Sequence, residues 1–454
     1  MTSTMMLRSL RLTESLKIRF QKQLFELRRT FLSEAYQCQE AWDKRLESSL
    51  LKKVKPIDFF AELDQKFSTQ KNVSAVDIDI FANAIQDKSH IEELTDLLYK
   101  LRMTRETTFT LNSTHHAVVR YCLKVGATKE LFNILDDRLN FGIFCEYYDY
   151  NLLMDHFIKK EDHASAAKVA TLMMLQEEFE HPLSNALAIY SCLKYLENPD
   201  SWQAVDPEVE RMNNEPKEEV KVRVKYIINP WFDDHFDLWK PSDLVGKTLF
   251  WIGQTMDNTI GRSCHLRGLV LYRKYDNAIA LLKKWKTDGL TKVVYKSILD
   301  AIKSDVPELF GTEVDELQKE LVQLLDDLSK QDLHDGDMLK DVEGLINKAI
   351  QTHSQNDISK QLQLYKDWEE KRINVLKEHL AYLDRQARLA KVEEMKKDLV
   401  DRERLLTFFE NEEQIELEIE KKLEKEKRLR GDVEASTIDN EDYIPPEIVR
   451  KRSN

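Results

Sequence analysis

The spacing of apolar residues predicts helices along almost the whole chain. Apolar positions recur three or four residues apart, as in Val118-Val119 followed by Cys122-Leu123, and this spacing places them on one face of a helix. Only 11 glycines and 10 prolines interrupt the 454 residues, whereas a sheet protein needs a turn every few residues. We therefore predict an all-α protein, whose length indicates two or three structural units rather than one core.

A repeat of 35 residues organises the first half of the chain. Shifting the sequence by this period aligns segments that begin at Ser113, Tyr148 and Leu183. The tenth to twelfth residues of the three segments match one another, as Cys122-Leu123-Lys124, Phe157-Ile158-Lys159 and Cys192-Leu193-Lys194. A pair of helices of this size cannot bury its own apolar faces, so residues 33–196 are predicted to stack into a solenoid of helical hairpins.

The turns of the repeat narrow its type, since the period alone fits both tetratricopeptide and pentatricopeptide units. Gly142 is expected to end a helix with φ > 0, and Gly126 to do the same at the turn inside the hairpin. The run 140–143 followed by 148–155 resembles the pentatricopeptide pattern, in which a helix ends at Gly-Ile and an extended entry leads to Tyr-Asn-x-Leu-Ile-Asp.

The resemblance extends to one family within that type. Residues 141–144 and 151–161 resemble the mitochondrial small ribosomal subunit protein twenty-seven family, and residues 31–36 with Trp42 resemble the start of its mature chains. The resemblance is strong over about residues 31–195. It implies a structural component of the mitochondrial ribosomal small subunit in the matrix, which supports translation through contacts with ribosomal proteins and some contact with ribosomal RNA.

The N-terminus predicts import into mitochondria independently of that resemblance. The chain carries a net charge of −13, of which residues 1–30 contribute +5 from seven basic and two acidic residues, so the remainder carries −18. Apolar residues alternate with the basic ones at helical spacing, which is typical of a presequence. We predict a presequence over residues 1–32, cleaved near residues 29–32; the alternative is an ordinary surface helix with a basic face.

Contacts with RNA are expected to be few, because an acidic body repels phosphate. In RNA-reading pentatricopeptide proteins, paired positions read one base per repeat. Here these pairs are His116 with Glu146 and Asn151 with His181, of which only Asn151 has the usual small polar type, so sequence-specific reading is disfavoured. The better candidates for phosphate contact form a column, one lysine per repeat, of Lys124, Lys159 and Lys194. The alternative is that these lysines are solvated residues near helix ends.

The middle of the chain is predicted to be irregular. Half of the prolines lie within residues 197–243, which interrupts the helical pattern. Four aromatic residues in this insertion form a candidate anchor for a partner protein: Trp231, Phe232, Phe236 and Trp239. The alternative is a loop that folds back onto the solenoid. Further helical pairs are predicted over residues 244–352.

The C-terminal part predicts one long charged helix over residues 353–430, because 345–430 contains no glycine or proline. An imperfect heptad stripe runs along it through Leu362, Tyr365, Leu376, Leu380, Leu383 and Ala387. The stripe fades toward the Glu-rich end, so we expect a helix that lies along partners rather than a homodimeric coiled coil. Residues 431–454 are predicted to be a flexible tail.

Candidate chemistry does not change this picture. Gly246-Lys247-Thr248 is similar to the end of a phosphate-binding loop, but Pro241 stands where the first glycine is required and the context is helical. There is no nucleophile–base pair and no metal-ligand spacing, so we expect no enzyme, no cofactor and no metal. No run of apolar residues is long enough to span a membrane. Two alternatives stay open: a soluble mitochondrial RNA-processing or translation factor, and a cytosolic scaffold.

Overall fold

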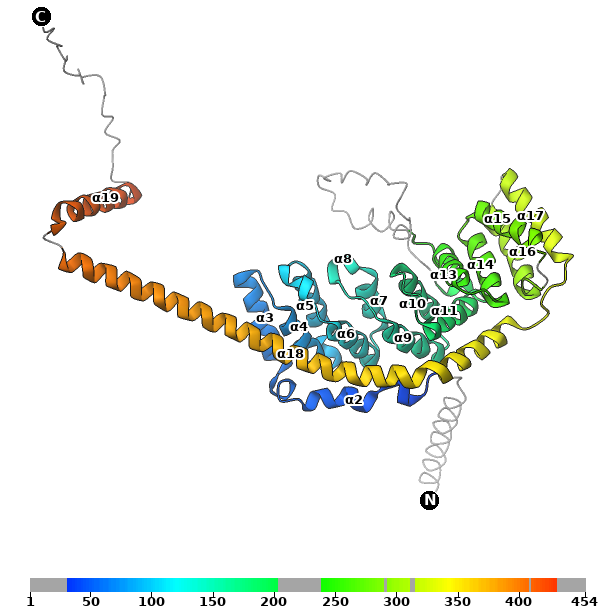
Figure 1. Cartoon of the computed structure of the whole chain (residues 1–454), viewed down its shortest axis with the longest axis horizontal. Coiled ribbons are helices and arrows are strands. Elements are labelled where there is room, and N and C mark those ends of the chain that lie inside the picture. Colours follow the sequence, from blue (N-terminus) through cyan, green and yellow to red (C-terminus); the bar gives the residue numbers. More distant parts are fainter. Residues whose placement is uncertain (1–30, 203–237, 290–291, 311–314, 408–409, 431–454) are drawn as a thin grey trace, which may run out of the picture. The chain divides into compact units, whose positions relative to one another are not determined.

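The computed structural model describes residues 31–202, 238–289, 292–310, 315–407 and 410–430 (Figure 1). The predicted presequence up to residue 30, the anchor residues Trp231, Phe232 and Phe236, and the predicted tail lie outside the described residues. The chain divides into two compact units, residues 1–373 and 374–454. Each is considered by itself below.

The described residues are helical in both units, and the expected all-α class is confirmed. In this part of the chain no helix combines the length and apolar character needed to cross a membrane. The helices that lie wholly within the first unit are α2 (Gln39–Lys44), α3 (Pro56–Gln70), α4 (Ala75–Ala84), α5 (Ile91–Arg102), α6 (Asn112–Val125), α7 (Thr128–Asp136), α8 (Arg138–Phe141), α9 (Tyr147–Lys159), α10 (His163–Leu175), α11 (Pro182–Tyr195), α13 (Pro241–Thr255), α14 (Thr259–Leu271), α15 (Tyr275–Thr287), α16 (Lys296–Phe310) and α17 (Glu316–Ser329). Helix α18 (Met338–Leu406) begins in the first unit and ends in the second, which also holds α19 (Glu412–Arg430).

The helix starts reproduce the 35-residue period. The first helices of three hairpins, α6, α9 and α11, begin at Asn112, Tyr147 and Pro182, and the second helices α7 and α10 begin at Thr128 and His163. First helices α4, α6, α9 and α11 contact one another in chain order, as expected for a solenoid (Figure 1). The prediction of a helical-hairpin solenoid is therefore confirmed.

Two glycines end helices where the sequence requires them. Gly126 follows α6 with φ of 69°, and Gly142 follows α8 with φ of 65°. Both lie in the left-handed region, which glycine adopts without the steric penalty that a Cβ brings. These two positions set the turn inside one hairpin and the connection between two hairpins.

Close packing of α13 on α14 explains the Gly246-Lys247-Thr248 run. A Cβ added at Gly246 would lie 2.7 Å from the Cβ of Leu271, so the two helices approach too closely for a larger residue. Lys247 is 1% exposed and its Nζ lies 5.1 Å from the centroid of the Tyr272 ring. Gly246 therefore serves helix packing, and Lys247 is buried against an aromatic ring rather than presented to a phosphate.

Substituting Gly268 on α14 tests this packing. A Cβ at this position would lie 2.3 Å from the backbone nitrogen of Phe250, which cannot move without shifting α13. We expect Gly268→Ala to lower the free energy of unfolding by about 1–3 kcal/mol, measured by urea denaturation. Gly344→Ala on α18 is the matched control, because a Cβ there meets nothing within 4 Å. The control should be neutral or slightly stabilising. An equal loss of unfolding free energy in both variants would contradict the close packing of α13 on α14.

Helix α18 differs from the predicted charged helix in its bounds and in its buried face. It begins at Met338 rather than near residue 353, and α19 starts only at Glu412 after a break. Leu362 and Leu380 of the expected heptad stripe are 38% and 62% exposed. The buried residues of α18 are Met338, Val342, Ile346, Ala349, Asp357, Gln361, Trp368 and Arg372. The face that α18 buries in the first unit thus changes from apolar to polar and aromatic after Ala349.

Candidate nucleic-acid interface

In RNA-reading pentatricopeptide proteins each helical repeat reads one base with two or three side chains. We call the face on which the candidate base-reading residues of the first helices lie the inner face, and here the chain itself covers it. Helices α4, α6 and α9 and the residue before α11 present polar side chains there, and residues 31–45 together with α18 as far as Arg372 lie against them (Figure 1). We call this surface, with the residues that cover it, the covered groove. Its contacts lie within the first unit.

A chain of hydrogen bonds joins α9, α6 and α18 at the centre of the covered groove. Nδ1 of His116 lies 2.5 Å from Oδ1 of Asp149, and Nε2 lies 3.0 Å from the hydroxyl of Tyr365. Burial lowers the pKa of His116, although Asp149 acts in the opposite direction. A lowered pKa favours the neutral ring, and the tautomer that satisfies both contacts has Nδ1–H donating to Asp149 and Nε2 accepting from the hydroxyl of Tyr365, whose own pKa burial raises.

A second connection joins the N-terminal segment to α18. Asp357 accepts from the hydroxyl of Tyr36 at 3.2 Å and lies 3.2 Å from Nε2 of His181, just before α11. The amide of Asn151 donates to the same Tyr36 hydroxyl at 3.0 Å. Tyr36 also stacks on Tyr148, with ring centroids 5.1 Å apart. One tyrosine near the start of the described chain thus ties α9 to α18.

A buried ion pair holds α18 on α4. Nε of Arg372 lies 2.6 Å from Oδ2 of Asp79, and both side chains are almost fully buried. The hydroxyls of Ser113 and Thr114 donate to the other carboxylate oxygen at 2.5 and 2.9 Å. Asp79 is therefore fully partnered, as a buried charge must be if its desolvation is to be offset.

The first described residues are held in a similar way. The backbone N–H groups of Phe31 and Leu32 donate to Oδ1 of Asp155 at 3.2 and 3.1 Å. The other oxygen of this buried carboxylate lies 2.8 Å from Nζ of Lys159. Since Leu32 is itself buried, both residues belong to the folded unit, although the predicted presequence extended to residue 32.

The two candidate base-reading residues are not accessible in this structure. Asn151 is 0% exposed and His116 is 2% exposed, and both are hydrogen-bonded within the covered groove. Their position on the inner face agrees with the repeat register, but Tyr36 and Tyr365 occupy the space that a base would need. We therefore do not propose Asn151 or His116 as RNA contacts.

The three lysines of the predicted column differ in their surroundings. Lys124 is exposed and donates to Oε1 of Gln86 at 3.2 Å. Lys159 pairs with Asp155, and Lys194 lies 3.0 Å from a carboxylate oxygen of Glu197. Two of the three charges are thus neutralised within the chain, and a phosphate contact through the column stays a prediction, chiefly for Lys124. Trp239, from the aromatic set, is partly buried with Nζ of Lys240 5.5 Å from its ring centroid.

Sequence reasoning singled out His116, Asn151 and Tyr365 for other roles, and it missed the charged residues that hold the covered groove together. Asp79, Asp357 and Arg372 gave no signal of their own, because a single charge in a helix usually lies on a solvated face. One signal was available on α18. Asp357, Gln361 and Tyr365 continue, at helical spacing, the apolar stripe that runs from Met338 to Ala349. Polar residues that extend an apolar stripe indicate a buried polar interface.

Metal chemistry finds no support in the residues that the structure describes. Among them, no three His, Cys, Asp or Glu side chains are grouped so that they could hold a metal ion. The five cysteines are buried free thiols, and burial raises the pKa of Cys122 to about 12. A thiol that stays protonated at neutral pH is a poor nucleophile and a poor ligand.

Removing Arg372 tests the ion pair that holds α18. We expect Arg372→Ala to lower the free energy of unfolding by about 3–5 kcal/mol in urea denaturation, because Asp79 would stay buried without its counter-charge. Lys371→Ala is the control, since that side chain is exposed on the same helix. The double variant Asp79→Asn/Arg372→Ala should lose less than the sum of the two single variants. Additive losses would mean that the pair does not couple α4 to α18.

The sequence of the chain also matches a known protein family. A sequence model of the mitochondrial 28S ribosomal protein S27 family matches residues 1–398. The matched region includes all the residues of the covered groove, and it ends within α18.

Proposed function

The chain belongs to the mitochondrial 28S ribosomal protein S27 family, and on that premise we propose that it is a non-catalytic scaffold of the mitochondrial ribosomal small subunit. Family membership implies a ribosome-associated component of that subunit. The finer proposal is that it works in the matrix and supports translation. Contacts with neighbouring ribosomal proteins would hold it in place, together with a few local contacts with ribosomal RNA.

The observation that carries this proposal is the covered groove. A factor that reads RNA through pentatricopeptide repeats needs an open inner face with base-reading side chains. Here that face is filled by Tyr36, Tyr365 and Arg372 of the same chain, which satisfy its buried polar groups. This arrangement favours a rigid structural part over the alternative, a soluble RNA-processing or translation factor.

The negative net charge of the chain supports the proposal that it makes few contacts with ribosomal RNA. Residues beyond 30 carry a net charge of −18, and such a body does not attract a phosphate backbone over long distances. Lys159 and Lys194 are paired with acidic residues of the chain. Contact with ribosomal RNA is therefore proposed only at local basic positions, of which Lys124 is one.

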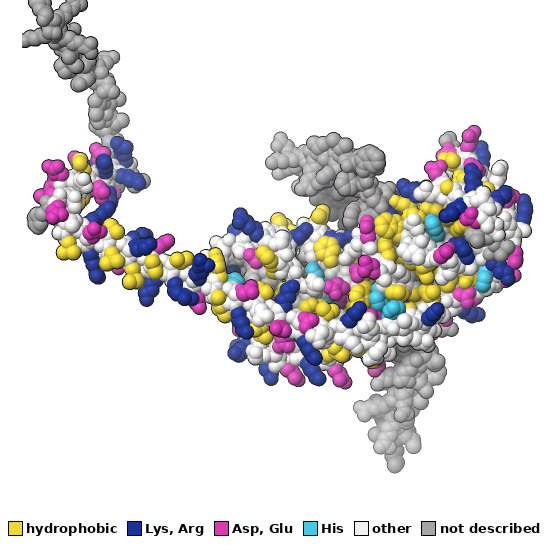
Figure 2. Space-filling model, in the orientation of Figure 1, with side chains coloured by type: hydrophobic (Ala, Val, Ile, Leu, Met, Phe, Trp, Pro, Cys, Tyr) yellow, Lys and Arg dark blue, Asp and Glu magenta, His cyan; other side chains and the backbone are white. Residues whose placement is uncertain are grey.

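Contacts with proteins are proposed mainly through the second unit. Along its part of α18, apolar side chains are exposed between charged ones (Figure 2), among them Leu380, Leu383, Leu389, Val392, Met395 and Leu399. Exposed apolar residues in such number usually mark an interaction surface. The aromatic set Trp231, Phe232, Phe236 and Trp239 stays a further proposed anchor for a partner.

Sedimentation of mitochondrial lysate tests the ribosomal assignment. We expect the protein to travel with the small subunit through a gradient at high magnesium concentration. When EDTA removes the magnesium, the protein should move together with the small-subunit RNA, in whichever fractions that RNA then sediments. Presence only in the soluble fractions at high magnesium would overturn the proposal and favour the soluble RNA-processing or translation factor.

Charge reversal at Lys124 tests the proposed local contact with RNA. We expect Lys124→Glu to reduce incorporation into the small subunit, measured as the ratio of bound to free protein in the gradient, because a nearby phosphate would be repelled. Lys129→Glu is the control, since it makes the same change at an exposed lysine of α7 outside the column. Equal incorporation of both variants and the wild type would remove Lys124 as an RNA contact.

A further inference from the structure

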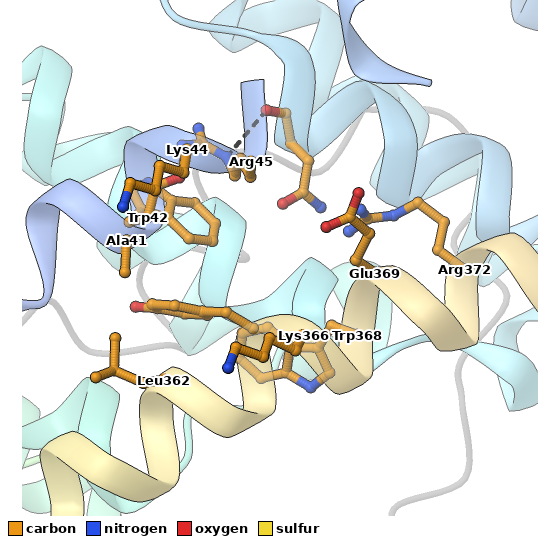
Figure 3. Close-up of a pocket in the computed structure, with 11 residues that line it drawn as sticks. Ala41, Trp42, Lys44, Arg45, Leu362, Lys366, Trp368, Glu369 and Arg372 are labelled. Carbon is orange, nitrogen blue, oxygen red and sulfur yellow. Dashed lines mark hydrogen bonds between the residues drawn. The ribbon is translucent and has the colours of Figure 1, made fainter. Parts of the chain in front are cut away.

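A cavity of about 330 Å³ lies between residues 41–45 and residues 362–372 of α18. Figure 3 shows Trp42 and Arg45 on one side of it and Lys366, Trp368 and Arg372 of α18 on the other. Its volume is at the lower end of the range of about 300–1,000 Å³ that is typical of sites for small organic ligands. The cavity lies within the first unit, at the edge of the covered groove.

Flat side chains form the inner walls of this cavity. Trp42 and Tyr365 have ring centroids 5.5 Å apart, and Tyr365 and Trp368 have centroids 5.6 Å apart. The guanidinium carbon of Arg45 lies 3.7 Å from the centroid of the Trp42 ring, so the arginine covers that ring as a second flat group. Aromatic rings and guanidinium planes are the groups on which proteins stack unpaired nucleotide bases.

The charged side chains that line the cavity are mostly cationic. Lys44, Arg45, Lys366 and Arg372 line it together with a single acid, Glu369. Burial lowers the pKa of Arg45 to about 10, so it stays protonated at neutral pH. Arg372 is paired with Asp79, which leaves the exposed Lys44 and Lys366 as the groups able to meet a phosphate at the rim. In an otherwise acidic body this is a local concentration of positive charge.

A second cavity shares Trp42 with the first. Its volume is about 350 Å³, and Arg120 and Lys124 of α6 contribute to its walls. The guanidinium of Arg120 lies 5.6 Å from the centroid of the Trp42 ring. A nucleotide strand entering the first cavity would therefore find further basic groups along the 37–45 segment, including the one exposed lysine of the repeat column.

On the basis of the ribosomal RNA contact proposed above, we propose that the Trp42–Tyr365–Trp368 cavity takes the base of one unpaired nucleotide of RNA. Lys44 and Lys366 would contact the adjoining phosphates. A base within a strand fits better than a free nucleotide, because no glycine-rich loop lines the cavity to enclose a terminal phosphate group. Stacking without a set of hydrogen bonds to the base edge implies weak preference among bases.

Ultraviolet crosslinking in intact mitochondria tests this site. The full chain, carrying a C-terminal affinity tag, is purified under denaturing conditions after irradiation, from both ribosomal and soluble gradient fractions. Nuclease and protease digestion then leave nucleotide adducts that mass spectrometry assigns to peptides. We expect an adduct on a peptide containing Trp42, Tyr365 or Trp368. No adduct on these peptides, while other small-subunit proteins of the same sample carry adducts, would overturn the site.

Three variants distinguish loss of nucleotide binding in the cavity from a general effect on the fold. Lys44→Glu/Lys366→Glu should lower the yield of the adduct about tenfold or more, because both rim charges are reversed. Lys360→Glu/Lys371→Glu is the control, with the same change of charge at exposed positions of α18 that do not line the cavity. It should leave the yield unchanged. Ala41→Trp, which places a ring in the cavity, should also abolish the adduct. An equal yield in all three variants would overturn the proposal.

The readouts distinguish this site from the ribosomal assignment. Sedimentation with the small subunit, together with absence of the adduct, would leave the scaffold function standing and remove the nucleotide site. The adduct in soluble fractions alone would support the site and overturn the scaffold function. A chemical crosslink that joins these peptides to a ribosomal protein, with no nucleotide adduct, would mean that a protein fills the cavity.

Discussion

The structure depends on how four buried carboxylates in the covered groove are partnered. Asp79, Asp149, Asp155 and Asp357 are each at most 3% exposed. Removing a carboxylate from water costs several kcal/mol unless a counter-charge or hydrogen-bond donors replace the water. Apart from Lys159, which is four residues from Asp155, the donors and counter-charges come from distant residues: Arg372, His116, Phe31, Leu32, Tyr36 and His181. The hairpins therefore reach this buried state only with α18 and the N-terminal segment in place.

This requirement changes the character of the solenoid. In an ordinary repeat array each hairpin contacts only its neighbours, and folding can start anywhere. Here successive residues of α18 contact the repeats in reverse chain order. Asp357 meets the residue before α11, Tyr365 meets α6, and Arg372 meets α4. One helix thus links separate repeats, and the first unit is expected to unfold cooperatively rather than repeat by repeat.

The sequence predicted the parts of the fold that local physics determines. The 35-residue register gave the starts of α6, α9 and α11, because apolar spacing and the turn glycines repeat with it. The same register aligns Asn151 with His116, and the structure places both side chains in the covered groove. The register could not show what covers the inner face, because Tyr36 lies 115 positions from Asn151, and Arg372 lies 293 positions from Asp79. No local pattern encodes such a pairing, and a lone charge on a helix predicts solvent by default.

A groove closed in this way can bind RNA only at its edges. Displacing α18 to admit a strand would separate Asp79 from Arg372 and Asp357 from Tyr36 and His181, and it would uncover the carboxylates of Asp79 and Asp149 beside the incoming phosphates. The loss of the buried pairs and the repulsion between like charges would both oppose binding. At the Trp42 cavity neither cost arises, because its rim is cationic and its aromatic walls are already held by His116 and Arg45. The chemistry that closes the groove therefore directs any contact with ribosomal RNA to this edge.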